Sequence, residues 1–189
     1  MIKDLVVKNR SYRRFDQGFV ISLETLKELV DLARLCGSAG NKQPLKYILS
    51  ADSRKNALIF EQLAWAGYLK EWPGPAEGER PSAYILMLGD KEISQSFDFD
   101  NGIAAQSILL GAAEKGLGGC MIASIQRTNL RERLNIPERY EIILVIALGR
   151  AIETVVLDTV KADGDIKYWR DGEGRHYVPK RALADIILP

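Results

Sequence analysis

The sequence is poor in the residues that most often build metal sites and nucleophilic sites. Its 189 residues include one histidine and two cysteines. Cys36 and Cys120 are far apart and match no metal-ligand spacing, so we expect no metal site, no disulfide framework and a reducing compartment. A serine hydrolase would have to use the single histidine, His176, but no GxSxG motif accompanies it. We therefore expect His176 to lie at the surface or to act through a neighbouring residue.

The chain also lacks a charge excess. Its formal net charge is +1 at pH 7, which gives no electrostatic reason to expect nucleic acid or an acidic membrane surface as a partner. The stretch Met1–Leu5 is not a basic start followed by a long apolar region, so we expect no signal peptide. These absences predict a cytoplasmic protein that acts on neither nucleic acid nor membrane.

The segment around which we expect the fold to be organised is Asn101–Met121. Between residues 103 and 113 only two residues are polar, so apolar or small side chains surround the whole helix. The run is too short and too interrupted for a membrane span, which needs about 20 apolar residues. A helix without a polar face predicts a central buried helix. We expect Asp100 or Asn101 to cap its start and Gly116 to be the left-handed residue just past its end.

Helical and strand patterns alternate along the rest of the chain. Helical periodicity predicts helices over Leu23–Leu35, Ser53–Trp65 and Asn129–Leu134, and Ser22 can cap the first of them. Apolar runs predict strands over Lys46–Ala51, Ala83–Gly89, Glu141–Gly149 and Glu153–Thr159. Lys70–Pro81 is a proline- and glycine-rich loop, and Asp163–Gly174 is a polar excursion. This alternation predicts one domain, residues 1–189, with a sheet covered by helices on both faces.

Three arginines within Arg10–Arg14 form a candidate anion site. Guanidinium groups present paired donors that match phosphate oxygens, and Ser11 adds a hydroxyl. From this segment alone, a solvated basic turn explains the same residues better, because such clusters are common on protein surfaces. A second basic pair, Lys180-Arg181, carries no signal by itself.

The loop Ser38–Pro44 is a candidate site for a flat polar ligand. Its small residues let a ring approach the backbone, and the side chains of Asn41 and Gln43 offer both donors and acceptors. The alternative is an ordinary loop between a helix and a strand. The glycines of Gly116–Gly119 follow a helix instead of a strand, so a cap and a tight turn explain them better than a dinucleotide fingerprint does.

Taken in order, these pieces resemble the nitroreductase family of flavin enzymes over nearly the whole chain. Arg10-Ser11-Tyr12-Arg13-Arg14-Phe15 is similar to the family's R-S-x-R-x-F, and Ser38–Pro44 is similar to its S-x-x-N-x-Q-P loop. The other three matches are Asp100–Gln106 with Gly116-Leu117-Gly118 to the central helix, Ile146–Gly149 to the late strand, and Val178–Leu183 to the C-terminal basic motif. Leu45 departs from the tryptophan that the family often has after Q-P.

This resemblance implies an α+β fold, a three-layer α/β/α sandwich with a mainly antiparallel sheet. It also implies an obligate homodimer with FMN at the interface. The residues it implies for the FMN phosphate and ribityl chain are Arg10, Ser11, Arg13 and Lys180 or Arg181. Those it implies around the flavin, some reaching it from the partner subunit, are Ser38, Ala39, Asn41, Gln43, Ala123 and Ser124.

The function that the resemblance implies is an NAD(P)H-dependent flavin oxidoreductase. FMN takes a hydride from NAD(P)H and then reduces a nitroaromatic, a quinone or a similar small acceptor, and the two substrates share one pocket in turn. Because the cofactor carries the chemistry, we name no catalytic acid or base in the protein. Two alternatives remain open: an FMN-binding sensor or carrier without significant turnover, and a flavin-free interaction protein. Trp72 makes the Lys70–Pro81 loop a candidate lid, and the sequence names neither the preferred nicotinamide nor the acceptor.

Overall fold

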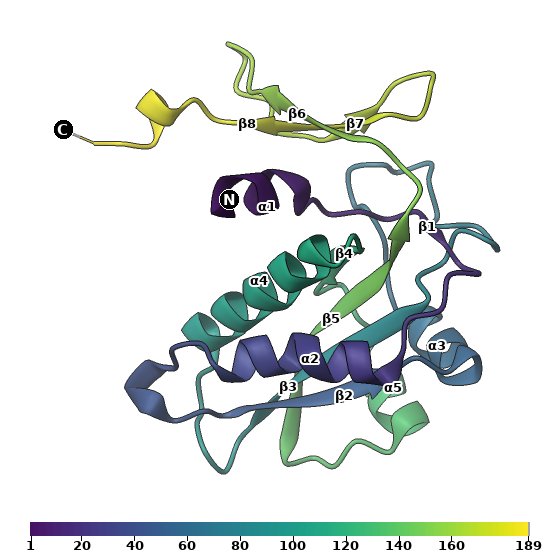
Figure 1. Ribbon diagram of the computed structural model, residues 1–189, viewed down its shortest axis with the longest axis vertical. Coiled ribbons are helices and arrows are strands. Elements are labelled where there is room, and N and C mark those ends of the chain that lie inside the picture. Colours follow the sequence, from purple (N-terminus) through teal and green to yellow (C-terminus); the bar gives the residue numbers. More distant parts are fainter. Residues whose placement is uncertain (189) are drawn as a thin grey trace.

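The computed structural model describes residues 1–188, so Pro189 of the expected domain lies outside the described part. A sheet of five strands forms its centre (Figure 1), with the order β1-β5-β3-β2 and with β4 also paired to β5. Every pairing in this sheet is antiparallel. Its strands are β1 (Phe15–Asp16), β2 (Leu45–Ser50), β3 (Ala83–Asp90), β4 (Gly118–Ile122) and β5 (Tyr140–Ala151).

A second sheet follows β5. Here β8 pairs in parallel with β6 and antiparallel with β7. Its strands are β6 (Val155–Thr159), β7 (Trp169–Arg170) and β8 (His176–Lys180). The polar excursion predicted from the sequence therefore contains β7. Strand pairing in the described part is mainly antiparallel, as predicted, and the fold is of the mixed α+β class.

In the described residues, five α-helices pack around the sheets: α1 (Ile2–Lys8), α2 (Leu23–Arg34), α3 (Ser53–Phe60), α4 (Asp98–Glu114) and α5 (Arg127–Leu134). Short 3₁₀ turns occupy Ala39–Asn41 and Leu183–Asp185. Among residues 1–188, no helix is both long and apolar enough to cross a membrane. The helix expected over Ser53–Trp65 ends early because Ala64 donates its backbone N–H to Ser124 O at 2.9 Å and the Trp65 side chain turns into the core.

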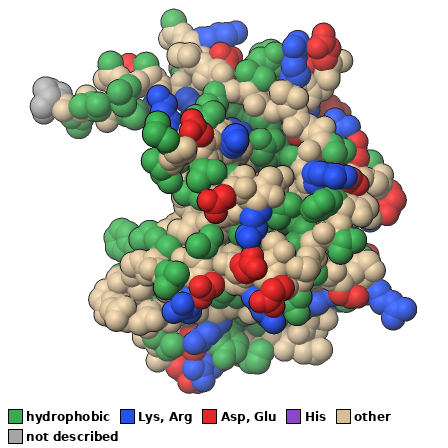
Figure 2. Space-filling model, viewed as in Figure 1, with side chains coloured by type: hydrophobic (Ala, Val, Ile, Leu, Met, Phe, Trp, Pro, Cys, Tyr) green, Lys and Arg blue, Asp and Glu red, His purple; other side chains and the backbone are tan. Residues whose placement is uncertain are grey.

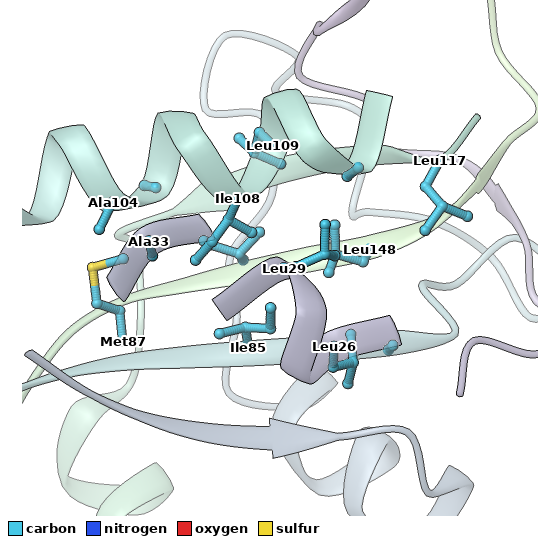
Figure 3. Close-up of a cluster of buried hydrophobic side chains, with 14 of the residues drawn as sticks. Leu26, Leu29, Ala33, Ile85, Met87, Ala104, Ile108, Leu109, Leu117 and Leu148 are labelled. Atoms are coloured by element: carbon cyan, nitrogen blue, oxygen red, sulfur yellow. The ribbon is translucent and has the colours of Figure 1, made fainter. Parts of the chain in front are cut away.

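Strand β3 is buried along its whole length because its side chains alternate between two cores. The odd-numbered side chains from Ala83 to Met87 join the core that α2 and α4 cover, as Figure 3 shows for Ile85 and Met87. The even-numbered side chains from Tyr84 to Leu88 join a second core that includes residues of α3 and α5. A strand buried on both faces has no polar alternation, which explains its uninterrupted apolar sequence.

The start of α4 differs from the expectation. The helix begins at Asp98, and its N-cap residue, Phe97, makes no side-chain cap. Asp100 lies inside the helix. Its buried side chain accepts hydrogen bonds from the Ser38 hydroxyl and from the backbone N–H of Ala39 at 2.9 Å. Neither Asp100 nor Asn101 is therefore the N-cap.

The end of α4 is as predicted. Gly116 has a φ of 73°, the left-handed conformation that glycine adopts without steric cost. Its N–H donates to Ala113 O at 3.2 Å, and the N–H of Leu117 donates to Ala112 O at 2.8 Å. These two bonds form a Schellman motif, which brings the chain from α4 directly into β4.

The prediction that α4 is buried on all sides is wrong for a single protomer. Its inner face packs against α2, and a Cβ at Gly111 would clash with Leu32. Its outer face leaves Phe99 77% exposed and Ile103 44% exposed. An apolar helix face without a cover in one protomer is a feature of surfaces that bind another protein chain.

The C-terminal segment, residues 155–188, forms an arm. Figure 1 shows β6, β7 and β8 apart from the first sheet, with α1 between the arm and α4. In Figure 2 the surface is hollowed between this arm and the rest of the molecule. The arm ends in exposed apolar side chains, which are Leu183, Ile186, Ile187 and Leu188.

Candidate functional site

A cavity of about 320 Å³ lies where the first residues after α1, the middle of α4, β4 and the arm come together. Its lining residues are Asn9, Arg10, Ser11, Arg13, Gln106, Leu109, Met121, Tyr168, His176, Val178 and Lys180. Three of them are cations and none is a carboxylate. The cavity is therefore suited to an anion, and we call it the cationic cavity.

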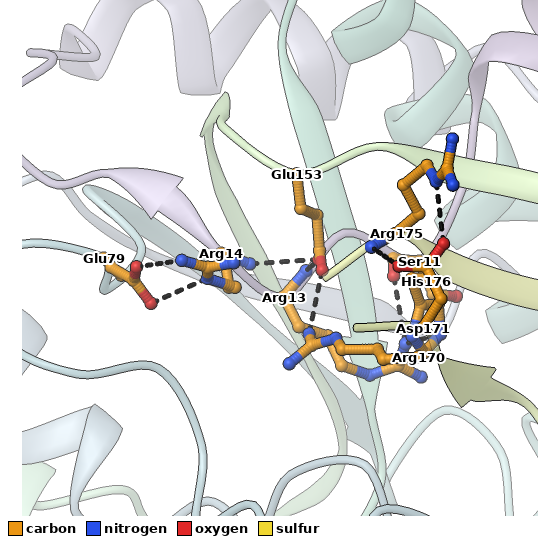
Figure 4. Close-up of polar contacts among 9 residues, drawn as sticks. All are labelled: Ser11, Arg13, Arg14, Glu79, Glu153, Arg170, Asp171, Arg175 and His176. Carbon is orange, nitrogen blue, oxygen red and sulfur yellow. Dashed lines mark hydrogen bonds and ion pairs between the residues drawn. The ribbon is translucent and has the colours of Figure 1, made fainter. Parts of the chain in front are cut away.

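Arg13 is fixed at the wall of the cationic cavity by three contacts (Figure 4). Its Nη1 donates to Ser11 O at 3.1 Å and lies 3.2 Å from Nε2 of His176. Its guanidinium carbon lies 4.8 Å from the centre of the Tyr168 ring, a cation–π distance. Because both polar contacts use Nη1, the Nε and Nη2 donors remain for a ligand.

His176 is fully buried, so the expectation of a surface position is wrong. Burial, and then the charges of Arg13 and Arg170, lower the pKa of His176 to about 4. The imidazole is therefore neutral near pH 7, and its Nε2 accepts from Arg13 while Nδ1 carries the proton. The other expectation, that His176 acts through a neighbour, agrees with its contact to Arg13.

Glu153 is a buried carboxylate that the sequence did not single out. Its side chain is 1% exposed. It accepts from the backbone N–H of Arg13 and from that of Arg14 at 3.1 Å, and from Arg170 at 2.8 Å. Its only sequence signal is a position at the start of a predicted strand, which does not distinguish it from an exposed residue.

The third arginine of the N-terminal cluster faces away from the cationic cavity. Arg14 Nε donates to Glu79 Oε2 at 2.8 Å, and Nη2 donates to the other oxygen. This paired hydrogen bond lowers the pKa of the Glu79 carboxyl. Arg14 thus ties the N-terminal segment to the Lys70–Pro81 loop, while Arg10 and Arg13 remain at the cavity.

The second set of predicted site residues lies at the start of α4. The Ser38 hydroxyl donates to Asp100 and accepts the backbone N–H of Gln43 at 2.9 Å, which closes the loop on itself. Asn41 and Gln43 both have φ of 52°, a conformation that is uncommon outside glycine and asparagine. The two side chains bond to each other at 3.2 Å and are exposed.

Ser38, Ala39 and Gln43 line two other cavities, beside Asp100, and not the cationic cavity. Residues 100 and 106 of α4 mark the two places, which lie about 9 Å apart along the helix axis at 1.5 Å per residue. Within one protomer, the cationic cavity and the loop Ser38–Gln43 therefore lie at two separate places along α4.

The comparisons with known proteins agree with the family resemblance. A model of the nitroreductase family matches residues 6–150. The chain belongs to the nitroreductase family. Its relatives include YodC of Bacillus subtilis (strain 168), which is named as an NAD(P)H nitroreductase. That protein is 26% identical over 180 residues, which cover 79% of this chain and 89% of the relative. A protein of Archaeoglobus fulgidus, named as an NADH dehydrogenase/NAD(P)H nitroreductase, is 29% identical over 153 residues, with 77% and 82% covered.

Solved structures share the fold. A nitroreductase structure from Desulfovibrio desulfuricans, in complex with FMN, superposes with a TM-score of 0.73 at 19% identity and covers 100% of this chain and 95% of its own. A nitroreductase family protein from Clostridium difficile 630 superposes with a TM-score of 0.66 at 21% identity, covering 81% of this chain and 85% of its own.

The remaining predicted residues do not all line the cationic cavity. Lys180 is among its lining residues, whereas Arg181 is exposed and is not. Ala123 and Ser124 are exposed and follow β4, whose Met121 lines the cavity. The prediction that all of them contact the cofactor stays a prediction.

The Lys70–Pro81 loop is held by contacts with residues outside the loop. Trp72 is half-buried, and the guanidinium carbon of Arg170 lies 4.3 Å from the centre of its ring. The side chain of Gln17 accepts the backbone N–H of Gly78 at 2.8 Å. The lining residues of the cationic cavity include none from this loop. The contacts within a protomer therefore do not support a lid role.

Proposed function

We propose that this nitroreductase binds FMN, with the FMN phosphate in the cationic cavity, and uses NAD(P)H to reduce a nitroaromatic, a quinone or a similar small acceptor. The observation that carries the proposal is the meeting of Arg10 and Arg13 with Lys180, from the other end of the chain, in a cavity without a lining carboxylate. The FMN in the structure of a relative with the same fold supports it.

The residues of the cavity fit a phosphate monoester. Such a group carries close to two negative charges near neutral pH and has three acceptor oxygens. Arg10, Arg13 and Lys180 supply matching cations, and Ser11 supplies a hydroxyl. Arg10 Nη2 is held by Val6 O at 2.7 Å, while its buried Nε has no partner among residues 1–188. This donor set exceeds what the protein itself satisfies.

FMN supplies the redox chemistry when bound, and the protein's residues bind and orient it. The cations of the cavity neutralise the phosphate and fix that end of the cofactor. Gln106 and Met121 line the same cavity and extend its wall from α4 and β4. We assign no general acid or base to the protein, because the flavin supplies the redox chemistry.

We also propose a homodimer of three-layer protomers. The exposed apolar side chains of Phe99 and Ile103 and the projecting arm support this assembly. It would bring the loop Ser38–Gln43 of one protomer toward the cofactor bound by its partner, which accounts for the separation of the two residue sets within one chain. The cytoplasmic location stays a prediction from the sequence.

The absorption spectrum of the purified protein tests the proposed function. We expect the yellow spectrum of an oxidised flavin and, under anaerobic conditions, loss of colour on addition of NADH or NADPH. Steady NAD(P)H oxidation with a quinone or nitroaromatic would then exclude a sensor or carrier. A colourless protein that takes up no added FMN would overturn the proposal and support a flavin-free interaction protein.

A further inference from the structure

The cationic cavity is built from two segments that are distant in the chain. Residues 10–13 follow α1, whereas His176 and Lys180 belong to β8 of the arm. The two segments are not neighbours in a sheet, since β8 pairs with β6 and β7. The residues between β5 and β6 lie between the two segments, because Ile152 donates its backbone N–H to Arg14 O at 3.1 Å and Thr154 O accepts the backbone N–H of His176 at 2.9 Å.

Glu153 contacts both segments. Toward the N-terminal segment, it accepts the backbone N–H groups of Arg13 and Arg14. Toward the arm, it accepts from Nη2 of Arg170 at 2.8 Å (Figure 4). Arg170 lies on β7 directly opposite His176 on β8. One buried carboxylate thus connects the Arg13 backbone with the strand pair that carries His176.

We infer that Glu153 is a positioning residue for the phosphate-binding site, which holds Arg13 and the arm in the arrangement that lets Arg13 and Lys180 bind the same phosphate. This inference rests on the proposed function. It assigns Glu153 no contact with the cofactor, because Glu153 is not among the residues that line the cavity.

A carboxylate beside an anion site would ordinarily repel the anion. Here the Glu153 charge is balanced, because Arg170 pairs with it and two backbone N–H groups point at it. The side chain of Arg170 is itself only 15% exposed and lies against Trp72. The carboxylate therefore organises donors without facing the cavity.

The substitution Glu153→Gln tests this role. An amide of the same shape keeps one acceptor oxygen, but its NH₂ group faces donors, so Arg13 and Arg170 cannot both be held. We expect the affinity for FMN to fall by about tenfold or more, which corresponds to one charge-assisted hydrogen bond, while the affinity for riboflavin changes little. Both affinities are measured by flavin titration of apo-protein.

Glu79→Gln is the matched control. Glu79 is a second carboxylate that contacts the N-terminal cluster. It pairs with the side chain of Arg14, which does not line the cavity. This variant should lose stability without a change in the ratio of FMN to riboflavin affinity. A changed ratio in Glu79→Gln would show that any damage to this region has the same effect, and would overturn the inference.

A double-mutant cycle separates positioning from general support. If Glu153 positions Arg13 as well as the arm, part of its effect passes through the Arg13 side chain, so the FMN affinity lost in the double variant Glu153→Gln, Arg13→Ala is smaller than the sum of the two single losses. Additive losses, or equal losses for FMN and riboflavin, would overturn the inference. If Glu153→Gln does not fold, Glu153→Asp replaces it in the cycle. This variant keeps the charge but shortens the side chain, and unchanged FMN binding in it would also count against positioning. A wild-type protein that binds no FMN would instead refute the proposed function.

Discussion

The Nη1 atom of Arg13 lies 3.2 Å from Nε2 of His176, a residue 163 positions later in the chain. This contact joins the N-terminal motif of the family to strand β8, which also carries Lys180. It requires an imidazole that accepts a hydrogen bond, and therefore a neutral His176. The position of Arg13 in the cationic cavity therefore depends on the protonation state of the buried His176.

Lys180 and Arg181 provide a matched pair of substitutions. Lys180 lines the cationic cavity and Arg181 does not, although the sequence motif treats them alike. We expect Lys180→Ala to lower FMN affinity about tenfold, the effect of one charge-assisted contact, and Arg181→Ala to leave it nearly unchanged. Flavin titration checks both. The reverse order would show that the partner subunit or a different arm position brings Arg181 to the phosphate.

His176 predicts how stability depends on pH. Its pKa is about 4 in the folded protein, against 6.5 for a free histidine. Between these values the unfolded chain binds a proton that the folded chain does not. The free energy of unfolding should therefore fall as the pH decreases from 6.5 to 4, by up to about 1.4 kcal/mol per pH unit.

The control for this pH dependence is His176→Gln, which removes the titrating group but keeps an acceptor for Arg13. Denaturant unfolding of the flavin-free proteins at several pH values measures both slopes. The depressed carboxyl groups, such as Asp90 and Glu79, are present in both proteins and cancel in the difference. If the free energy of unfolding had the same pH slope in the two proteins, His176 would take up its proton at the same pH in the folded and the unfolded chain, and its pKa would not be lowered by folding.

Two substitutions in α4 separate folding from dimerisation. Gly111 faces Leu29 and Leu32 of α2 within one protomer, so Gly111→Glu places a charge in the core and should destabilise the fold by more than about 3 kcal/mol. Ile103 is 44% exposed in one protomer and belongs to the proposed interface, so Ile103→Glu should fold but be monomeric, unlike the wild type. Circular dichroism and analytical sedimentation distinguish these outcomes. A well-folded dimer of Ile103→Glu would place the interface elsewhere.

Local patterns predicted much of the fold. The apolar run of β3, the Ser22 cap of α2 and the left-handed Gly116 each depend on nearby residues, and the structure has all three. The Ser22 side chain accepts the backbone N–H of Thr25 at 3.0 Å. Such features are visible in sequence because their physical cause lies within a few positions.

The features that the sequence did not predict depend on contacts between residues that are distant in the chain. Asp100 is of a residue type that often caps helices, but its carboxylate instead accepts a hydrogen bond from Ser38, which is distant in the chain. Glu153 and His176 gain their roles only when β6 and β8 pack beside the N-terminal segment. The family motifs indicated Arg10, Arg13 and Lys180, which the structure brings to one cavity, but they did not indicate Glu153, which contacts the segments on either side of it.

The central claim is that the cationic cavity binds the FMN phosphate, and titration of apo-protein with FMN and riboflavin tests it most directly when wild type and Arg13→Ala are compared. We expect wild type to bind FMN more tightly than riboflavin. In Arg13→Ala, FMN affinity should fall by about 10- to 100-fold, from the loss of roughly 1.5–3 kcal/mol, while riboflavin affinity stays nearly the same. Equal losses for both flavins, or no loss for either, would contradict the account.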